Sequence, residues 1–232
     1  MKILGIDTST KSFSTCICEE ARILYEITGD RIFSSDIKSG NFFLVVHDLI
    51  NGVEKIDAIA LTIGPGMFTS LRVGLALAKG LFLSRRIPIC AVNTLEVIAY
   101  TVAFSNFIDS NYLIAPVMEA FQKEIFVALF KSHRRISKDL VFKPEDFLKF
   151  AWEKYKDEKI IIAGPGVQLL KDFAQGKDKN RIIISESPLF CPSASKVVLT
   201  ALRRIKMGIF DDPELLEPHY IKKTSAEAKL KE

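Results

Sequence analysis

One carboxylate and the hydroxyl groups that follow it are the residues best suited to chemistry on a phosphate. Asp7 comes directly after the apolar run KILGI and opens the polar segment DTSTKS, in which Thr8 and Ser9 are its neighbours. A carboxylate in this place could hold a magnesium-bound phosphate. The same residues also suit a plain hairpin turn in which Asp and Ser accept hydrogen bonds from the backbone. The residues alone leave both interpretations open.

A glycine-rich turn is the second feature with a chemical interpretation, and it joins an apolar strand to a helical pattern: Gly64, Pro65 and Gly66. Free N–H groups at the start of a helix attract anions such as phosphate. However, Thr69 stands where a dinucleotide fingerprint needs its third glycine, and the GxxxxGK[ST] pattern is absent. A structural turn is therefore favoured. A second Gly-Pro-Gly, with Gly164 and Gly166, could lie against the adenosine of a nucleotide.

Other catalytic patterns are missing from the sequence. His47, His133 and His219 form no HxxH, HExxH or HxxxH pair, and no GxSxG element supplies a nucleophile. Glu119 and Glu124 flank a hairpin-like turn, for which a surface hairpin is favoured over an acid–base pair. These absences favour a protein that binds over one that catalyses.

Composition indicates an ordinary globular protein. The chain has 232 residues, 48% of them hydrophobic, and a formal net charge of +4, which excludes collagen-like and largely disordered chains. Its basic residues form short, scattered groups, unlike those of a dedicated nucleic-acid binder. Four cysteines without a CxxC pair, and no long apolar segment, predict a cytoplasmic protein without disulfides or a membrane span.

The order of predicted elements repeats, which favours an α/β protein with mixed sheets and two similar halves. The first half, residues 1–109, is expected to contain three strands in a meander, a helix over 36–51, a strand, the first Gly-Pro-Gly, a helix over 67–84, a strand, and a helix over 93–103. The second, smaller half, residues 110–232, is expected to repeat the meander, helix, strand and Gly-Pro-Gly. Its last helix, over 193–207, would be capped by Ser193 or Ser195.

Two helices of the first half predict a binding surface for another protein. The helix after Gly66 carries Gly74 with Ala78, and Ala76 with Gly80, each pair at four-residue spacing. Small residues on two sides allow close packing on both, so that one side would suit the core and the other a partner helix. The helix over 36–51 has an apolar arc wider than one core contact needs.

Three segments together resemble the bacterial TsaB (YeaZ) family: ILGIDTST, IGPGMFTSLRVGLALAKGL followed by IPICAVNTLEVIA, and LEPHYIKKTSAE. The resemblance implies the actin/hexokinase/Hsp70-like (ASKHA) fold of two duplicated RNase H-like domains. It implies a non-catalytic scaffold subunit for threonylcarbamoyladenosine formation next to the tRNA anticodon. The implied partners are TsaD in a heterodimer, TsaE through that complex, a second copy in a homodimer, and tRNA indirectly. No intrinsic cofactor is implied, although ATP or ADP could bind at the complex interface.

The resemblance also implies roles for individual residues. The partner-binding residues would be Phe42, Phe43, Val46, Ile50, Leu71, Gly74, Leu75, Leu77 and Ala78. Those that shape the turn would be Gly64, Pro65, Gly66, Phe68, Thr69 and Arg72, and a nucleotide would meet Asp7, Thr8, Ser9, Gly164 and Gly166. The chain departs from the family pattern at Lys38, Met67, Ser70 and Phe121. The alternative function is a free-standing ATP-binding phosphotransferase or hydrolase that uses Asp7.

Overall fold

The computed structural model describes residues 1–30, 42–105, 111–173 and 181–221, so Lys38 and the predicted start of the first helix lie outside the described residues. The chain folds into two compact α/β units with mixed sheets, as the sequence predicts. The N-terminal unit consists of Met1–Val97 and Pro192–Pro218, and the C-terminal unit of Ile98–Cys191 and His219–Glu232.

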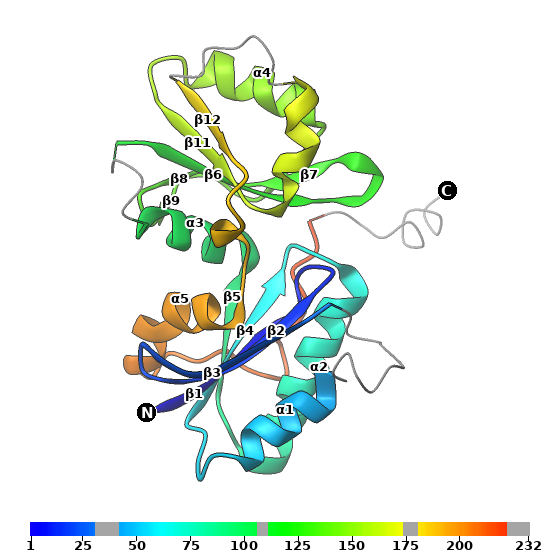
Figure 1. The fold of residues 1–232 in the computed structure, drawn as a ribbon, viewed down its shortest axis with the longest axis vertical. Coiled ribbons are helices and arrows are strands. Elements are labelled where there is room, and N and C mark those ends of the chain that lie inside the picture. The colour runs from blue at the N-terminus through cyan, green and yellow to red at the C-terminus, as the bar shows by residue number, and fades with distance from the viewer. Residues whose placement is uncertain (31–41, 106–110, 174–180, 222–232) are drawn as a thin grey trace. The chain divides into compact units, whose positions relative to one another are not determined.

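The N-terminal unit contains a five-stranded sheet in the order β3-β2-β1-β4-β5. Its elements follow the predicted order (Figure 1): β1 Lys2–Asp7, β2 Phe13–Glu19, β3 Arg22–Gly29, α1 Phe42–Asn51, β4 Ala58–Gly64, α2 Phe68–Arg85 and β5 Ile89–Asn93. The next helix, α3 Thr94–Ala103, begins in this unit and continues into the C-terminal unit. The β1–β2 and β2–β3 pairs are antiparallel, whereas β4 runs parallel to both β1 and β5. The mixed sheet results from this change of direction.

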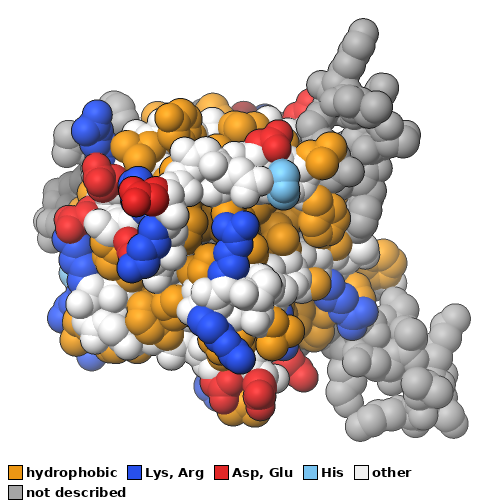
Figure 2. Space-filling model, turned by 90° about the horizontal axis from the view of Figure 1, so that it is seen from below, with side chains coloured by type: hydrophobic (Ala, Val, Ile, Leu, Met, Phe, Trp, Pro, Cys, Tyr) orange, Lys and Arg blue, Asp and Glu red, His pale blue; other side chains and the backbone are white. Residues whose placement is uncertain are grey.

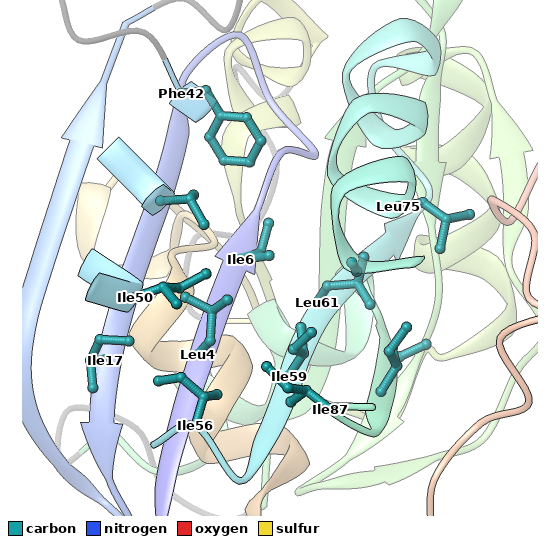
Figure 3. Close-up of a cluster of buried hydrophobic side chains, with 14 of the residues drawn as sticks. Leu4, Ile6, Ile17, Phe42, Ile50, Ile56, Ile59, Leu61, Leu75 and Ile87 are labelled. Carbon is teal, nitrogen blue, oxygen red and sulfur yellow. The ribbon is translucent and has the colours of Figure 1, made fainter. Parts of the chain in front are cut away.

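Both faces of this sheet are buried along β1, β2, β4 and β5, whereas the edge strand β3 is largely exposed. One face packs against α1 and α2, and Figure 3 shows Phe42 and Ile50 of α1 over Leu4, Ile6 and Ile17 of the strands. The opposite face packs against α5, Ala194–Lys206, through the apolar stripe of that helix. Residues alternate between the two faces along a strand, so Cys16 and Cys18 lie under α5 while Ile17 faces α1. The two cysteines are core residues.

The C-terminal unit repeats the same connections. Its elements are β6 Leu113–Glu119, β7 Ile125–Val127, β8 Phe130–Lys131, β9 Arg134–Arg135, β10 Leu140–Phe142, α4 Pro144–Lys154, β11 Ile160–Ala163, the 3₁₀ helix η3 Pro165–Phe173 and β12 Ile182–Ser185. The strand order β10-β7-β6-β11-β12 reproduces that of the first sheet position by position. The sequence predicted this duplication of order but missed β12, and it predicted an ordinary helix where η3 forms.

The last helix packs in the N-terminal unit, although the sequence assigned residues 110–232 to a separate second domain. Its side chains Val197, Val198 and Ala201 are buried among strand residues of the first sheet. The physical reason is that the second face of this sheet is apolar and, among the described residues of 1–97, only Val97 at the start of α3 covers it from a helix. The structural boundary therefore differs from the predicted one.

The start of α5 is held by side chains from the strands beneath it. Ser14 accepts a 2.7 Å hydrogen bond from the N–H of Ala194, and Glu26 accepts from the N–H and the hydroxyl of Ser195 at 2.9 and 2.8 Å. Of the two predicted caps, Ser193 occupies the N-cap position but its side chain makes no capping hydrogen bond, and Ser195 lies inside the helix. The side chain of Asn93 caps α3, accepting hydrogen bonds from the N–H groups of residues 95 and 96.

Within the ranges that the structure describes, no helix is long and apolar enough to cross a membrane.

Candidate functional site

Asp7 lies at the end of β1, where its carboxylate is almost fully buried and already bonded. Its Oδ1 accepts hydrogen bonds from the hydroxyl of Ser9 at 2.7 Å, from the N–H of Ser9 at 3.2 Å and from the hydroxyl of Thr62 at 2.7 Å. Thr62 belongs to β4, which pairs with β1. The three donors hold the carboxylate within the sheet end and the turn that follows it.

Burial raises the pKa of Asp7 above its usual value, and the hydrogen bonds from Ser9 and Thr62 offset only part of this rise. The carboxyl group therefore holds its proton more tightly than a surface aspartate does. A buried acid of this kind could bind a cation-bound phosphate only after the surrounding loop opened, because its surface exposure is 2%. The geometry favours a structural role for Asp7.

The first Gly-Pro-Gly turn packs against the loop that carries Asp7. The N–H of Met67 donates a 2.9 Å hydrogen bond to the carbonyl of Ser9, and a Cβ atom on Gly66 would collide with the same carbonyl. Gly64 has φ of 114°, a conformation that favours glycine. The glycines of the turn thus let it pack closely against the protein's own backbone at Ser9, which agrees with the interpretation of Gly-Pro-Gly as a structural turn.

The helix after the turn closes over the same loop. A Cβ atom on Gly74 would lie 2.5 Å from Oγ1 of Thr8, so the glycine lets α2 approach β1. Among the described residues, Oγ1 of Thr8 has no hydrogen-bond partner although it is buried. Asp7, Thr8, Ser9 and the first Gly-Pro-Gly turn are therefore brought together. Thr62 was not among the predicted site residues, although it is the one polar residue near the end of the apolar strand AIALTIG.

The second Gly-Pro-Gly turn repeats this packing in the C-terminal unit. Gly164 has φ of 115°, and a Cβ atom on Gly166 would lie 2.8 Å from the backbone of Met118 in β6. Gly164 and Gly166 therefore lie against backbone of their own unit.

The polar cluster itself is not repeated. Leu61, three residues before Gly64, pairs with Ile6, and Ile161, three residues before Gly164, pairs with Ile114. By this register the counterparts of Asp7 and Thr62 are Ala115 and Ile162, which are fully buried apolar residues. The second unit has no carboxylate at the position of Asp7.

The predicted partner-binding residues fall into two groups. Most are buried and form part of the core or its margin: Phe42, Val46, Ile50, Leu71, Gly74, Leu75 and Ala78. Their prediction as surface residues is corrected here, because the apolar arc of each helix is the side that packs on the sheet. Phe42, for example, packs edge-on against Phe13 of β2, with the two ring centres 5.1 Å apart. Phe43 is exposed and Leu77 is partly buried.

A different side of α2 faces solvent. Its exposed residues recur at spacings of three and four: Thr69, Arg72, Ala76, Gly80 and Leu83. We call this set the outer seam of α2. A Cβ atom on Gly80 would meet nothing within 4 Å, whereas the Gly74 side is filled by Thr8. The two small-residue sides predicted from the sequence thus exist, one packed and one open.

Further apolar side chains reach the surface of the N-terminal unit. Phe43 and Leu44 of α1 are 45% and 55% exposed, and Tyr25 and Ile27 of the edge strand β3 are 58% and 41% exposed. Figure 2 shows hydrophobic side chains among charged ones on the face seen from below. Arg72 places its guanidinium 3.9 Å from the ring centre of Phe68, which orients one long side chain of the outer seam.

The remaining departures from the family pattern have different surroundings. Met67 is exposed, whereas Ser70 is buried in the first turn of α2. Phe121 is 72% exposed in the hairpin between β6 and β7, where Gln122 and Lys123 both have positive φ. The turn is a surface hairpin, closed by a 2.8 Å hydrogen bond from the N–H of Ala120 to the carbonyl of Glu124.

Comparisons with known proteins identify relatives along nearly the whole chain. A family model described as TsaD, tRNA N6-adenosine threonylcarbamoyltransferase, matches residues 47–230. The tRNA threonylcarbamoyladenosine biosynthesis protein TsaB of Bacillus subtilis is 25% identical over 237 residues, which cover 99% of this chain and 97% of that protein. The TsaB of Escherichia coli is 24% identical, with coverage of 99% and 98%.

Solved structures show the same fold. YeaZ from Pseudomonas aeruginosa superposes with a TM-score of 0.73 at 22% identity, covering 95% of this chain and 99% of that one. A polyphosphate/ATP-glucomannokinase from Arthrobacter reaches a TM-score of 0.50 at 11% identity, with coverage of 89% and 99%. The fold is that of the actin/hexokinase/Hsp70-like proteins. The chain therefore belongs to the tRNA N6-adenosine threonylcarbamoyltransferase (TsaD) family and, within it, to the TsaB/YeaZ group.

Proposed function

We propose that this protein is a non-catalytic subunit in the biosynthesis of tRNA threonylcarbamoyladenosine and that it acts by binding TsaD. The role in the pathway rests on the full-length likeness to TsaB proteins, whose names state it. The single observation that carries the mode of action is the open outer seam of α2, with Ala76 and Gly80 at its centre.

The outer seam suits a helix of a partner protein. Its spacings of three and four residues are those by which one helix packs along another. Small residues at its centre let two backbones approach closely, while Leu83 at 70% exposure offers apolar area that a partner would cover. Exposed Phe43 and Leu44 extend the apolar surface to α1, which packs on the same face of the sheet.

The closed state of Asp7 supports the absence of catalysis. Its Oδ1 is engaged by three donors of the same chain, and its counterpart in the second unit is Ala115. A nucleotide-dependent transferase needs accessible groups that meet the phosphate. We propose accordingly that the protein holds no cofactor of its own, that ATP or ADP binds only where it meets TsaD, and that TsaE and tRNA join through that complex. Alone, it pairs with a second copy through the same helices.

The test is a charge placed on the outer seam. Ala76→Glu keeps a good helix former but puts a carboxylate where the partner helix would pack. Light scattering after size exclusion should show a complex between the unchanged protein and TsaD of the same organism, and A76E should weaken it about 100-fold, as loss of a central contact does. Ala21→Glu, which adds the same charge at an exposed alanine beside β3, is the matched control. If both variants bound TsaD equally well, the outer seam would be rejected as the TsaD-binding surface.

The alternative is an ATP-binding phosphotransferase or hydrolase in which Asp7 meets the nucleotide. The likeness in fold to an ATP-dependent kinase is the observation in its favour. Phosphate release by the isolated protein, lost in Asp7→Ala, would support it. Support of TsaD activity by D7A without any turnover of its own would support the subunit.

A further inference from the structure

The C-terminal unit carries an exposed stack of aromatic rings. The ring centres of Tyr100 and Phe104 lie 4.3 Å apart with an interplanar angle of 34°, and those of Phe104 and His133 lie 6.2 Å apart, also at 34°. Phe104 follows α3 and is 61% exposed, and His133 is exposed in the turn between β8 and β9. An aromatic side chain in this position exposes apolar area to water, and ring stacking within the unit covers only part of it.

Two cationic residues flank His133 of this stack in its hairpin. Lys131 and Arg134 pair across the β8–β9 hairpin on either side of His133, and both are exposed. Lys131 also pairs with Leu113 at the start of β6, and the N–H of Leu113 donates to the carbonyl of Lys159 at 2.8 Å. The backbones of these three cationic residues, two in the β8–β9 hairpin and one just before β11, thus lie together at one end of the second sheet.

The one ion pair described for Lys131 leaves its ammonium group available. Nζ of Lys131 lies 3.9 Å from a carboxylate oxygen of Glu158, with both side chains substantially exposed. An ion pair of this length at the surface contributes little and is easily exchanged for a phosphate. The ammonium of Lys159 lies 5.6 Å from the ring centre of Tyr112, which keeps it beside an aromatic surface.

We propose that this surface, Tyr100, Phe104, Lys131, His133, Arg134 and Lys159, binds a single-stranded segment of RNA. A base would stack on the ring of Phe104, and Lys131 and Arg134 would bind the phosphates on either side. Aromatic rings between cations are the combination by which proteins bind single strands, because every base has a face for stacking and every nucleotide carries a negative charge. The inference rests on the proposed function, which supplies an RNA substrate, and it adds a direct contact where only an indirect one was expected.

The probe is a fluorescently labelled, unmodified tRNA transcript that carries an adenosine next to its anticodon, titrated with the full-length protein alone and with its TsaD complex. Phe104→Ala should weaken binding about 5- to 100-fold, the range for loss of one stacked base. Phe104→Leu should weaken it similarly, whereas Phe104→Trp should restore it. Leu215→Ala, which removes an apolar side chain of 80% exposure in the N-terminal unit, should change nothing.

Salt dependence and competition identify the type of contact. Arg134→Glu should lower the slope of log affinity against log salt by at least about one, while Arg85→Glu, at an exposed arginine of α2, should leave it unchanged. A single-stranded oligonucleotide should compete and an RNA duplex should not. Equal effects of R134E and R85E, efficient competition by the duplex, or no binding of RNA in either state would overturn the proposal.

Failure here is separable from failure of the proposed function. Phe104→Ala should form the TsaD complex as the unchanged protein does, and A76E should bind RNA unchanged when tested alone. If F104A retains full RNA affinity while A76E loses TsaD, the RNA surface is rejected and the subunit role stands. A thermal melt of F104A, F104L and F104W confirms that each variant is folded.

Discussion

The hydroxyl of Thr62 donates a 2.7 Å hydrogen bond to Oδ1 of Asp7, 55 residues earlier in the chain. This bond joins the ends of two neighbouring strands at the point where the first Gly-Pro-Gly turn begins. Thr62→Val keeps the shape of the side chain and removes the donor. We expect the variant to lose about 1–3 kcal/mol in the free energy of unfolding, since a buried carboxyl group loses a partner. Urea denaturation measures this, and an unchanged midpoint would show that the bond contributes nothing.

The raised pKa of Asp7 predicts the sign of a pH dependence. Because the folded protein holds the proton more tightly than the unfolded chain, stability falls as the pH rises from the usual value of 3.8 through the pKa of the folded state. Asp7→Asn removes this loss, so its stability relative to the unchanged protein should increase from pH 4 to pH 7. Urea midpoints across this range are the measurement.

Asp57 serves as a control, because its contribution to stability should change with pH in the opposite direction. Its carboxylate accepts a 2.8 Å hydrogen bond from the N–H of Lys2, and this bond lowers its pKa below the usual value of 3.8. Its stabilising contribution is therefore present above pH 3.8 and is lost as the pH falls. Asp57→Asn should cost more stability at pH 7 than at pH 3. A parallel pH response of D7N and D57N would contradict both assignments.

Two glycines of α2 should respond to alanine in opposite directions. Gly74→Ala places a methyl group against Thr8, and we expect a loss of about 1–3 kcal/mol in unfolding free energy. Gly80→Ala places one in open space and should gain about 0.5–1 kcal/mol, because alanine is the better helix former. Thermal and urea unfolding test both. If the outer seam binds TsaD, G80A should also weaken the complex despite its greater stability.

Glu26 should stabilise α5 from a different part of the chain. Glu26→Ala removes the acceptor of two hydrogen bonds at the start of this helix, and we expect a cost of about 0.5–2 kcal/mol, the range for loss of a helix cap. Hydrogen exchange should increase at the first turn of α5. Glu19→Ala, at an exposed glutamate of β2, serves as the control and should leave exchange at α5 unchanged.

The four thiols should react in two stages. Cys16, Cys18 and Cys90 are buried, and burial raises the pKa of the Cys90 thiol to about 11, so none should react with a thiol reagent while the protein is folded. Cys191 is partly exposed and should react first. Thiol titration before and after denaturation, with Cys191→Ser as a control, checks the order. Rapid native labelling of C191S would show that the first sheet opens readily.

Local pattern alone was enough to predict the strands, helices and turns of the first half, because burial on one face imposes a period that the residues display. The repeated order of strands, helix and Gly-Pro-Gly also predicted the duplication, and the structure confirms it in the strand order of both sheets. Asp7, Thr8 and Ser9 were singled out by their residue types, but the contact of their loop with the first Gly-Pro-Gly turn was not predicted, because it joins residues far apart in sequence. The short strand β12 was missed because it has no flanking turn signal strong enough to separate it.

Only the tertiary structure decided which apolar residues are core and which face solvent. The sequence showed that α1 and α2 are apolar around much of their circumference, but it could not tell which side the sheet would cover. Phe42 and Leu75, which the sequence predicted to bind a partner, are buried in the core. Likewise, α5 follows the second half in the chain yet covers the first sheet, because burying an apolar face depends on spatial proximity and not on chain order. The Asp7–Thr62 bond and the stack around Phe104 also depend on long-range pairing, which no local pattern records.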